Sequence, residues 1–191
     1  NRTHMKTPEF NAEETYQLAM QAYQSGQLPM AELHLRNILM RLPDNDGIIA
    51  TLGGILLASG KVEEGISQLE TAVRINNNNL EAKVNLGVAY QNTGRIDEAS
   101  ELVGEVAKAL PDRADIQFNY ANTLLQKQNY KEGIIVLKKV IELQPDFLQA
   151  HQMLGSIYTY LNDIEKAIEV FKNILLQVRN DLTTSINLAN L

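Results

Sequence analysis

One spacing dominates this sequence: small residues recur every 34 positions in two separate series. The first series is Ala19, Gly53, Gly87, Ala121 and Gly155, and the second is Ala31, Gly65, Ala99, Gly133 and Ala167. A position that holds only alanine or glycine indicates that two backbones approach closely there, because a larger side chain would overpack the contact. Apolar residues within each repeat fall at steps of three and four, which is the spacing of one helical face. Each repeat is therefore predicted to be two amphipathic helices.

Large apolar residues keep the same step and are expected to interlock between helices. They precede the first small series by one residue and follow the second by four: Leu18, Leu52, Leu86, Tyr120 and Leu154, then Leu35, Leu69, Val103, Leu137 and Phe171. A single helical hairpin cannot cover its own apolar face, so about three or more neighbouring repeats are needed for stability. We therefore expect the repeats to stack into one continuous array.

Residues that end helices stand at fixed places in each repeat. Gly26, Gly60 and Gly94 lie between the two predicted helices, where a residue able to adopt positive φ ends the first one. Asn162 takes this place in the fifth repeat, and Gln128 breaks the pattern in the fourth. Between repeats stand the pairs Pro43-Asp44, Pro111-Asp112 and Pro145-Asp146. The proline is expected to stop the preceding helix, and the acidic side chain to cap the next helix or complement its dipole.

Two fragments carry a resemblance to a known family. They are Leu86-Gly87-Val88-Ala89-Tyr90, followed by Ala99, Val103 and Pro111, and Leu154-Gly155-Ser156-Ile157-Tyr158, followed by Ala167 and Phe171. Each resembles the tetratricopeptide repeat, and the resemblance covers residues 12–191. It implies an all-α fold, a tetratricopeptide-type solenoid of helical hairpins in a right-handed superhelix. It also implies that the first helix of each repeat lines a concave groove.

The period sets the expected boundaries. Residues 1–11 are interpreted as a vector remnant, Asn1 to His4, with an N-terminal lead-in. Five full repeats are predicted at 12–45, 46–79, 80–113, 114–147 and 148–181. Residues 182–191 are expected to begin a sixth repeat, because Asn187-Leu188-Ala189 matches Asn85-Leu86-Gly87. An unfinished repeat indicates a fragment of a longer protein, and self-association caused by truncation is expected at its uncapped end.

Composition excludes several classes of partner. The chain has 45% hydrophobic and 21% charged residues, a net charge of -6 and no segment rich in Lys or Arg. A nucleic acid or an anionic membrane would therefore meet no attractive field. No apolar run approaches the roughly 18 residues of a membrane-spanning helix, and no signal peptide is evident at the start. We expect a soluble protein, cytoplasmic rather than periplasmic.

Residues that could carry catalysis do not cluster. The chain has no cysteine, and His34 and His151 stand more than three repeats apart. No metal-ligand, phosphate-cradling or nucleophile-elbow motif occurs. We therefore expect a chain that is not an enzyme and that binds no cofactor and no metal. His151 stands at a helix-packing place, and a structural role is predicted for it.

The resemblance implies that the groove carries the function. The family's groove positions can be assigned to this sequence one repeat at a time. The candidate partner-binding residues at these positions are Tyr16, Met20, Tyr23, Val84, Asn85, Val88, Phe118, Asn119, Asn122, Gln152 and Tyr160. The second repeat contributes a small, rather apolar set: Thr51, Gly54, Leu57 and Ala58. Glu81 is expected on the same face. Aromatic residues and methionine would supply apolar contact area.

Two features of the sequence narrow the range of ligands that the groove is expected to bind. No Lys or Arg stands at the groove positions, so a chaperone tail held by a carboxylate clamp, which requires cations, is disfavoured. Asn85, Asn119 and Asn187 share one place in their repeats, as an asparagine ladder does in the repeat domains of O-linked sugar transferases. An Asn amide offers both a donor and an acceptor and can pair with a peptide backbone. The alternative that these amides bond neighbouring helices is equally open.

We expect a protein-protein interaction scaffold that binds a partner peptide or protein segment in the concave groove. One alternative is the substrate-recruiting arm of a larger enzyme, such as a glycosyltransferase or sulfotransferase. Another is an assembly factor or structural spacer, as in secretion or pilus machinery, that binds through its convex face or its ends.

Overall fold

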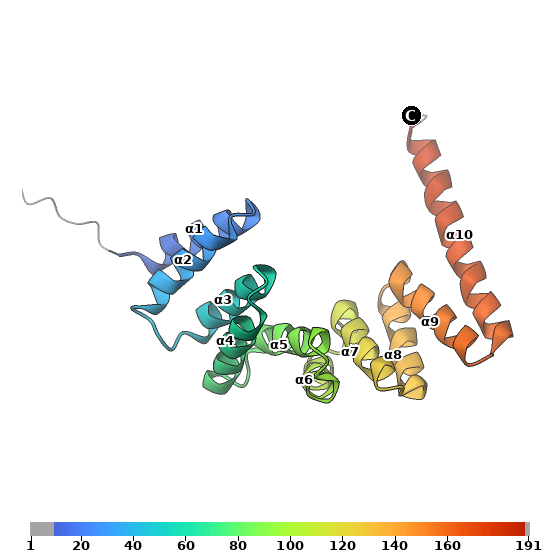
Figure 1. The fold of residues 1–191 in the computed structure, drawn as a ribbon. Helices are drawn as coiled ribbons and strands as arrows, with labels where there is room; N and C mark the ends of the chain where they lie inside the picture. The colour runs from blue at the N-terminus through green and yellow to red at the C-terminus, as the bar shows by residue number, and fades with distance from the viewer. Residues whose placement is uncertain (1–9, 190–191) are drawn as a thin grey trace, which may run out of the picture. The chain divides into compact units, whose positions relative to one another are not determined.

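The 34-residue step reappears in the positions at which helices begin. A computed structural model describes residues 10–189 and folds them into paired helices (Figure 1). The first helices of the pairs are α1 (Ala12–Gln24), α3 (Asp46–Ala58), α5 (Leu80–Asn92), α7 (Ala114–Gln126) and α9 (Leu148–Tyr160). The second helices are α2 (Leu28–Leu39), α4 (Val62–Ile75), α6 (Ile96–Ala109), α8 (Tyr130–Leu143) and α10 (Ile164–Ala189). The described residues form no strand, and the predicted all-α solenoid of helical hairpins is confirmed.

The chain divides after Thr93 into two compact bodies. In the N-terminal body, successive helices from α1 to α5 pack against each other, and α3 also contacts α5. In the C-terminal body, successive helices from α6 to α10 do the same. Contacts between sequence neighbours are the pattern expected of a repeat array.

The small residues lie at the helix crossings, as their spacing predicts. Ala19 and Ala31 have no exposed surface. A Cβ on Gly53 would lie 3.1 Å from the carbonyl oxygen of Gly65, and a Cβ on Gly65 would lie 3.0 Å from the carbonyl oxygen of Gly53. The two glycines therefore face each other where α3 crosses α4, and their lack of side chains permits the close backbone contact.

Most of the predicted large apolar residues are buried, but Tyr120 is only partly buried, and Leu18 and Phe171 are exposed. Leu35, Leu69 and Leu137 are fully buried, as expected. Leu18 is 49% exposed on α1, the first described helix. Phe171 is 40% exposed on α10, the last described helix, although its ring covers Gly155.

The turns within the pairs confirm the role of the predicted helix-ending residues. Gly26, Gly60, Gly94 and Asn162 all have positive φ, between 59° and 82°. Gln128 also has a φ of 60°, although it has neither the freedom of glycine nor the short amide of asparagine. The helix pair imposes the left-handed conformation at this place even where the residue disfavours it.

Asparagines, and not the aspartates that follow proline, cap the helices, which leaves only the second of the two expected roles of those aspartates, complementing the helix dipole. Asn11, Asn45 and Asn79 occupy the N-cap positions of α1, α3 and α5, again at the 34-residue step. Asn45 Oδ1 accepts from the Ile48 amide at 3.0 Å, and Asn79 Oδ1 accepts from the Ala82 amide at 2.9 Å. Asparagine has the short side chain that this geometry requires and stands one residue closer to the helix than Asp44.

The expected break before a sixth repeat is absent from the described residues. Helix α10 continues without interruption from Ile164 to Ala189, through position 182. Arg179 stands where Pro43, Pro111 and Pro145 end earlier repeats, and arginine has no tendency to stop a helix. The interpreted vector remnant and the side chain of Asn187 lie outside the described part of the chain.

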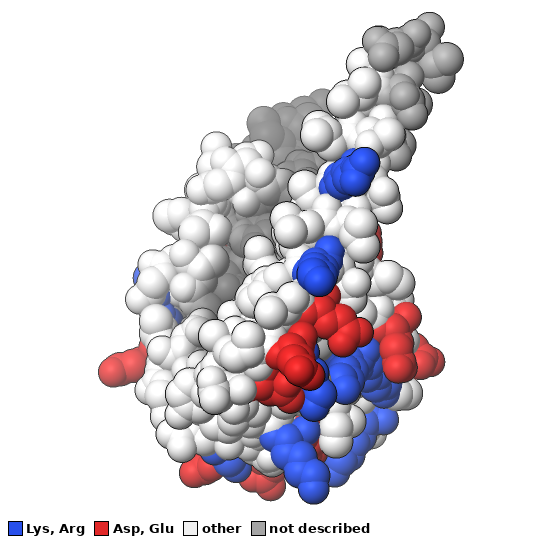
Figure 2. Space-filling view, turned by 90° about the vertical axis from the view of Figure 1, so that its right-hand side faces the viewer, with Lys and Arg blue, Asp and Glu red and all other residues white. Residues whose placement is uncertain are grey.

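Helix α10 also carries exposed apolar side chains. Leu175, Leu182 and Ile186 are each more than half exposed. Figure 2 turns this side of the molecule to the viewer and shows few charged side chains along the rising helix, whereas charges of both signs mix below it. The expected self-association stays a prediction.

Candidate functional site

Helices α1, α3 and α5 line a groove of about 360 Å³ in the N-terminal body. Its walls are formed by Tyr16, Met20, Tyr23, Thr51, Gly54, Ile55, Leu57, Glu81, Asn85 and Val88. All three helices are first helices of their pairs, which is the arrangement that the resemblance implies. Five of the predicted candidates therefore line one surface, and Val84, which is partly buried, does not line it.

Gly54 lies on the α3 side of this groove and leaves space there. The nearest atom to a Cβ on Gly54 would be Asn85 Nδ2, at 3.9 Å, which is an ordinary contact distance. The neighbouring Gly53 differs, because a Cβ there would lie only 2.7 Å from Leu69 Cγ. Packing therefore requires a glycine at position 53 and does not require one at position 54.

Polar groups in the groove are few. The Thr51 hydroxyl donates to the Gly47 carbonyl oxygen at 2.9 Å and is thus used within α3. Among residues 10–189, the Asn85 amide makes no hydrogen bond and the Glu81 carboxylate no ion pair. This weakens the interpretation that Asn85 bonds a neighbouring helix and leaves its amide available to a ligand.

The aromatic and apolar side chains of α1 form the opposite wall. Tyr16 and Met20 are partly buried and pack against the core of the N-terminal body. Tyr23 is 48% exposed near the end of the same helix. Partly buried side chains of this kind hold a fixed position and still offer a face to a ligand.

The candidates in the C-terminal body have other partners. The Phe118 ring packs against Phe147, with 4.9 Å between the centroids. Tyr160 is 71% exposed, its ring centroid is 5.2 Å from that of Tyr130, and the neighbouring Tyr160 hydroxyl raises the pKa of Tyr130. The amide residues of this set are the partly buried Asn119 and Asn122 on α7 and the exposed Gln152 on α9. Neither Phe147 nor Tyr130 was predicted from the sequence as a partner of these rings.

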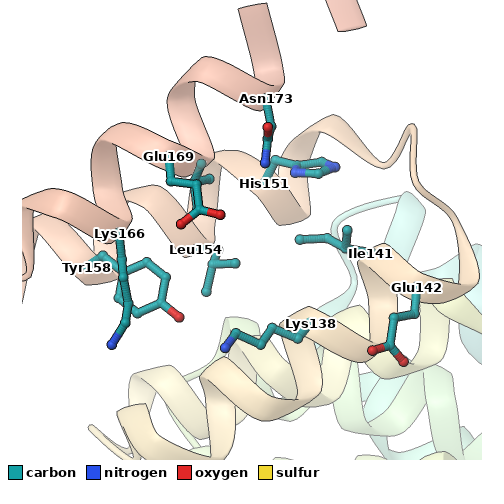
Figure 3. A pocket seen from close by; sticks show the side chains of 10 residues that line it. Lys138, Ile141, Glu142, His151, Leu154, Tyr158, Lys166, Glu169 and Asn173 are labelled. Atoms are coloured by element: carbon teal, nitrogen blue, oxygen red, sulfur yellow. The ribbon is translucent and has the colours of Figure 1, made fainter. Parts of the chain in front are cut away.

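A second cavity, of about 380 Å³, lies between α8, α9 and α10 and was not predicted from the sequence. Figure 3 shows the Tyr158 hydroxyl and the Glu169 carboxylate pointing into it, above the side chain of Lys138. Lys166 Nζ lies 5.6 Å from the centre of the Tyr158 ring and pairs with Asp163 at 2.9 Å. The side chains around this cavity therefore carry both signs of charge.

Two substitutions at the repeat step explain why this cavity is open. One repeat earlier, the Tyr120 ring fills the space over Gly104, 3.1 Å from where a Cβ would stand, and its hydroxyl donates to Glu132 at 3.1 Å. In the fifth repeat, Leu154 replaces Tyr120 and Lys138 replaces Gly104. Leucine is too short to fill the same space.

His151 beside this cavity has a structural role, as predicted. It is 6% exposed, and its Nε2 lies 2.7 Å from the carbonyl oxygen of Pro145. Gln177 Nε2 donates to the same oxygen at 2.6 Å. These bonds tie α9 and α10 to the turn after α8. In the described part of the chain, no three His, Asp or Glu side chains are grouped so that they could hold a metal ion.

No helix within residues 10–189 combines the length and the apolar character needed to cross a membrane.

Comparisons with solved structures identify proteins with the same fold. MamA from Desulfovibrio magneticus RS-1, residues 41 to the end, superposes with a TM-score of 0.83 at 17% identity, covering 88% of this chain and 96% of that one. A crystal structure of MamA protein superposes with a TM-score of 0.81 at 19% identity, and the match covers 90% of this chain and 94% of that one. At this level of identity, the likeness concerns the fold alone.

Relatives in sequence are longer proteins. Protein O-mannosyl-transferase Tmtc3 of Drosophila melanogaster is 26% identical over 133 residues, which are 62% of this chain and 14% of the relative. Protein O-mannosyl-transferase TMTC1 of Homo sapiens is 26% identical over 90 residues, which are 47% of this chain and 10% of the relative. The chain therefore matches only a small part of each relative's length.

Family models match the chain over most of the paired helices. A model described as tetratricopeptide repeat matches residues 56–121, and a second model with this description matches 114–147 and 148–175. These matches together extend from 56 to 175, which is more than half of the 191 residues. The paired helices of the structure begin at the same 34-residue step. The chain belongs to the tetratricopeptide repeat family.

Proposed function

We propose that the N-terminal body is a protein-interaction module that holds a segment of a partner polypeptide in the groove between α1, α3 and α5. The observation that carries this proposal is Gly54. A glycine inside a helix costs about 1 kcal/mol relative to alanine, yet a Cβ at this position would meet only Asn85, at 3.9 Å. The packing of the helices does not require a glycine at this position. A ligand seated closely against α3 does require one, because a side chain would occupy its place.

The groove chemistry supports a peptide as the ligand. Tyr16, Met20 and Val88 offer apolar surface to the side chains of a bound segment. The Asn85 amide can donate to a peptide carbonyl and accept from a peptide N–H, which holds the backbone without reading its sequence. Tyrosine adds contact area at a low entropic cost because it has few rotatable bonds.

A variant whose groove is filled by a larger side chain tests the proposal. A displayed library of random dodecapeptides is panned on the immobilised chain, and recovered peptides are titrated against the wild type and against Gly54→Leu. The leucine occupies the space that the ligand would use, so we expect affinity to fall about tenfold or more, which corresponds to about 1.4 kcal/mol. Because Asn85 Nδ2 lies 3.9 Å from the new Cβ, the variant is expected to fold.

Ser67→Leu is the matched control. It adds a side chain of the same size to the same body at an exposed position on α4, outside the groove. Helical circular dichroism and thermal unfolding check that both variants are folded, and Asn85→Ala provides a second groove variant. Recovered peptides that bind folded Gly54→Leu as tightly as the wild type would contradict the proposal.

A second candidate function is suggested by the relatives in sequence. Both are O-mannosyl-transferases whose matched segment is a small part of their length. The repeats would then present a substrate polypeptide to a catalytic domain in the same protein. Sequencing the complete gene tests this candidate: a transferase domain encoded in frame supports it, and a gene that encodes only helical repeats excludes it.

A further inference from the structure

The three helices around the groove carry charge of mainly one sign. Helices α1, α3 and α5 contain four carboxylates: Glu13, Glu14, Asp46 and Glu81. Their single cation is Lys83, which is 6% exposed and does not line the groove. Among the described residues that line the groove, Glu81 alone carries a formal charge. A ligand approaching this surface meets a negative field.

Most other cations of the N-terminal body have partners away from the groove. Arg36 on α2 pairs with Glu32 and with Glu64 of α4, and Lys61 Nζ lies 2.8 Å from Glu32 Oε2. The Arg41 guanidinium lies 4.3 Å from the centre of the Phe10 ring. None of these cations lines the groove or neutralises Glu81.

A cationic side chain would fit the groups that the groove offers. The Glu81 carboxylate has no ion-pair partner among residues 10–189. Tyr16 and Tyr23 line the same groove, and the face of a tyrosine ring attracts a lysine ammonium or an arginine guanidinium. The apolar surface of Met20 and Leu57 lies in the same wall and suits an apolar neighbour of that cation.

We infer that the segment bound in this groove presents a lysine or arginine side chain next to an apolar residue. The basic group pairs with Glu81 and contacts a tyrosine ring, and the apolar residue occupies the space over Gly54. This inference rests on the proposed function, because it assigns the chemistry of the partner to the same groove.

Glu81 also lies in the first turn of α5, where a carboxylate complements the helix dipole. That role is local to the helix and does not depend on a partner. Glu14 lies in the first turn of α1, is exposed and does not line the groove. Glu14→Gln therefore removes the same charge from the first turn of another helix and serves as the control for Glu81→Gln.

The test uses the dodecapeptides recovered on the wild-type chain. We expect them to be enriched in lysine or arginine over the starting library. Replacing the basic residue of one peptide with glutamine is expected to weaken binding about three- to tenfold. Glu81→Gln is expected to weaken binding of the unchanged peptide about two- to fivefold, with a smaller effect at high salt. Glu14→Gln should leave the affinity unchanged.

The outcomes separate this inference from the proposed function. Peptides that lose affinity for Gly54→Leu but show no basic enrichment, or bind Glu81→Gln as tightly as the wild type, overturn the basic anchor and leave the groove as a binding site. Peptides indifferent to Gly54→Leu, or a library that yields no binder, overturn both. Replacing the basic residue of the peptide should weaken binding less on the Glu81→Gln chain than on the wild type. That difference assigns the loss of affinity to the pair formed by Glu81 and the basic residue.

Discussion

At Gly53 a Cβ would lie 2.7 Å from Leu69 Cγ and 3.1 Å from the Gly65 carbonyl oxygen, whereas at Gly54 it would meet only Asn85, at 3.9 Å. Glycine therefore stands at these two adjacent positions of one helix for two different physical reasons. The first is required by the crossing of α3 and α4. The second leaves space in the groove, and its cost to the helix is not recovered by packing.

This difference predicts opposite effects of one substitution. Gly53→Ala is expected to lower the free energy of unfolding by about 1–3 kcal/mol, because a carbonyl group and a branched carbon must move. Gly54→Ala is expected to raise it by up to about 1 kcal/mol through helix propensity. Urea unfolding followed by circular dichroism measures both. Equal effects of the two alanines would contradict the assigned helix crossing.

Gln128 gives a second prediction for a single residue. Its φ of 60° lies in the left-handed region, which glycine adopts without steric cost. Gln128→Gly is expected to raise the free energy of unfolding by about 0.5–1 kcal/mol, after allowing for the greater freedom of the unfolded glycine. Gln126→Gly, at the last residue of α7, should not raise stability, because the backbone there is not in the left-handed region. A loss of stability in Gln128→Gly would be evidence against the left-handed turn.

At the scale of elements, the helix starts could be predicted from the sequence because the 34-residue step fixes them. The continuation of α10 past position 181 could not be predicted in this way, because it depends on one departure from the pattern, Arg179 in the place of proline. The asparagine caps were not anticipated for a similar reason. The proline-acid pairs drew attention to Asp44, while Asn45 beside it has the geometry to bond the first turn.

An ion-pair network joins α2 to α4 and predicts a dependence of stability on pH. The hydrogen bond from Lys61 holds the pKa of Glu32 below its ordinary value of 4.5, assisted by Arg36. A carboxyl group with a lowered folded-state pKa stabilises the protein above its unfolded-state pKa, and this contribution is lost as the pH falls through the folded-state value. The contribution of Glu32 is therefore complete at neutral pH and declines below about 4.5.

Glu32→Gln measures this contribution. At pH 7 the variant is expected to be less stable than the wild type by up to about 1 kcal/mol, since most of the network is exposed. The difference should shrink as the pH is lowered below the ordinary pKa of Glu32. Thermal unfolding of both proteins across an acidic pH series provides the measurement. A difference that is constant with pH would argue against the ion pairs as its source.

At the scale of the whole molecule, the sequence predicted part of the candidate site. Tyr16, Met20 and Asn85 could be placed because the resemblance fixes which helical positions face the groove. The stacking of Phe118 on Phe147 could not, because Phe147 stands in a turn outside those positions. The second cavity depends on the relative sizes of Leu154 and Tyr120, which a pattern of apolar residues does not distinguish.

The most direct test of the central claim is to map where a partner segment contacts the chain. Amide chemical shifts of the isotope-labelled wild-type protein are recorded while a library-selected dodecapeptide is added. We expect the largest changes to cluster on α1, α3 and α5 around the groove residues. Changes confined to α2 and α4, or to the cavity between α8 and α10, would contradict groove binding and favour a spacer that contacts partners through its outer face.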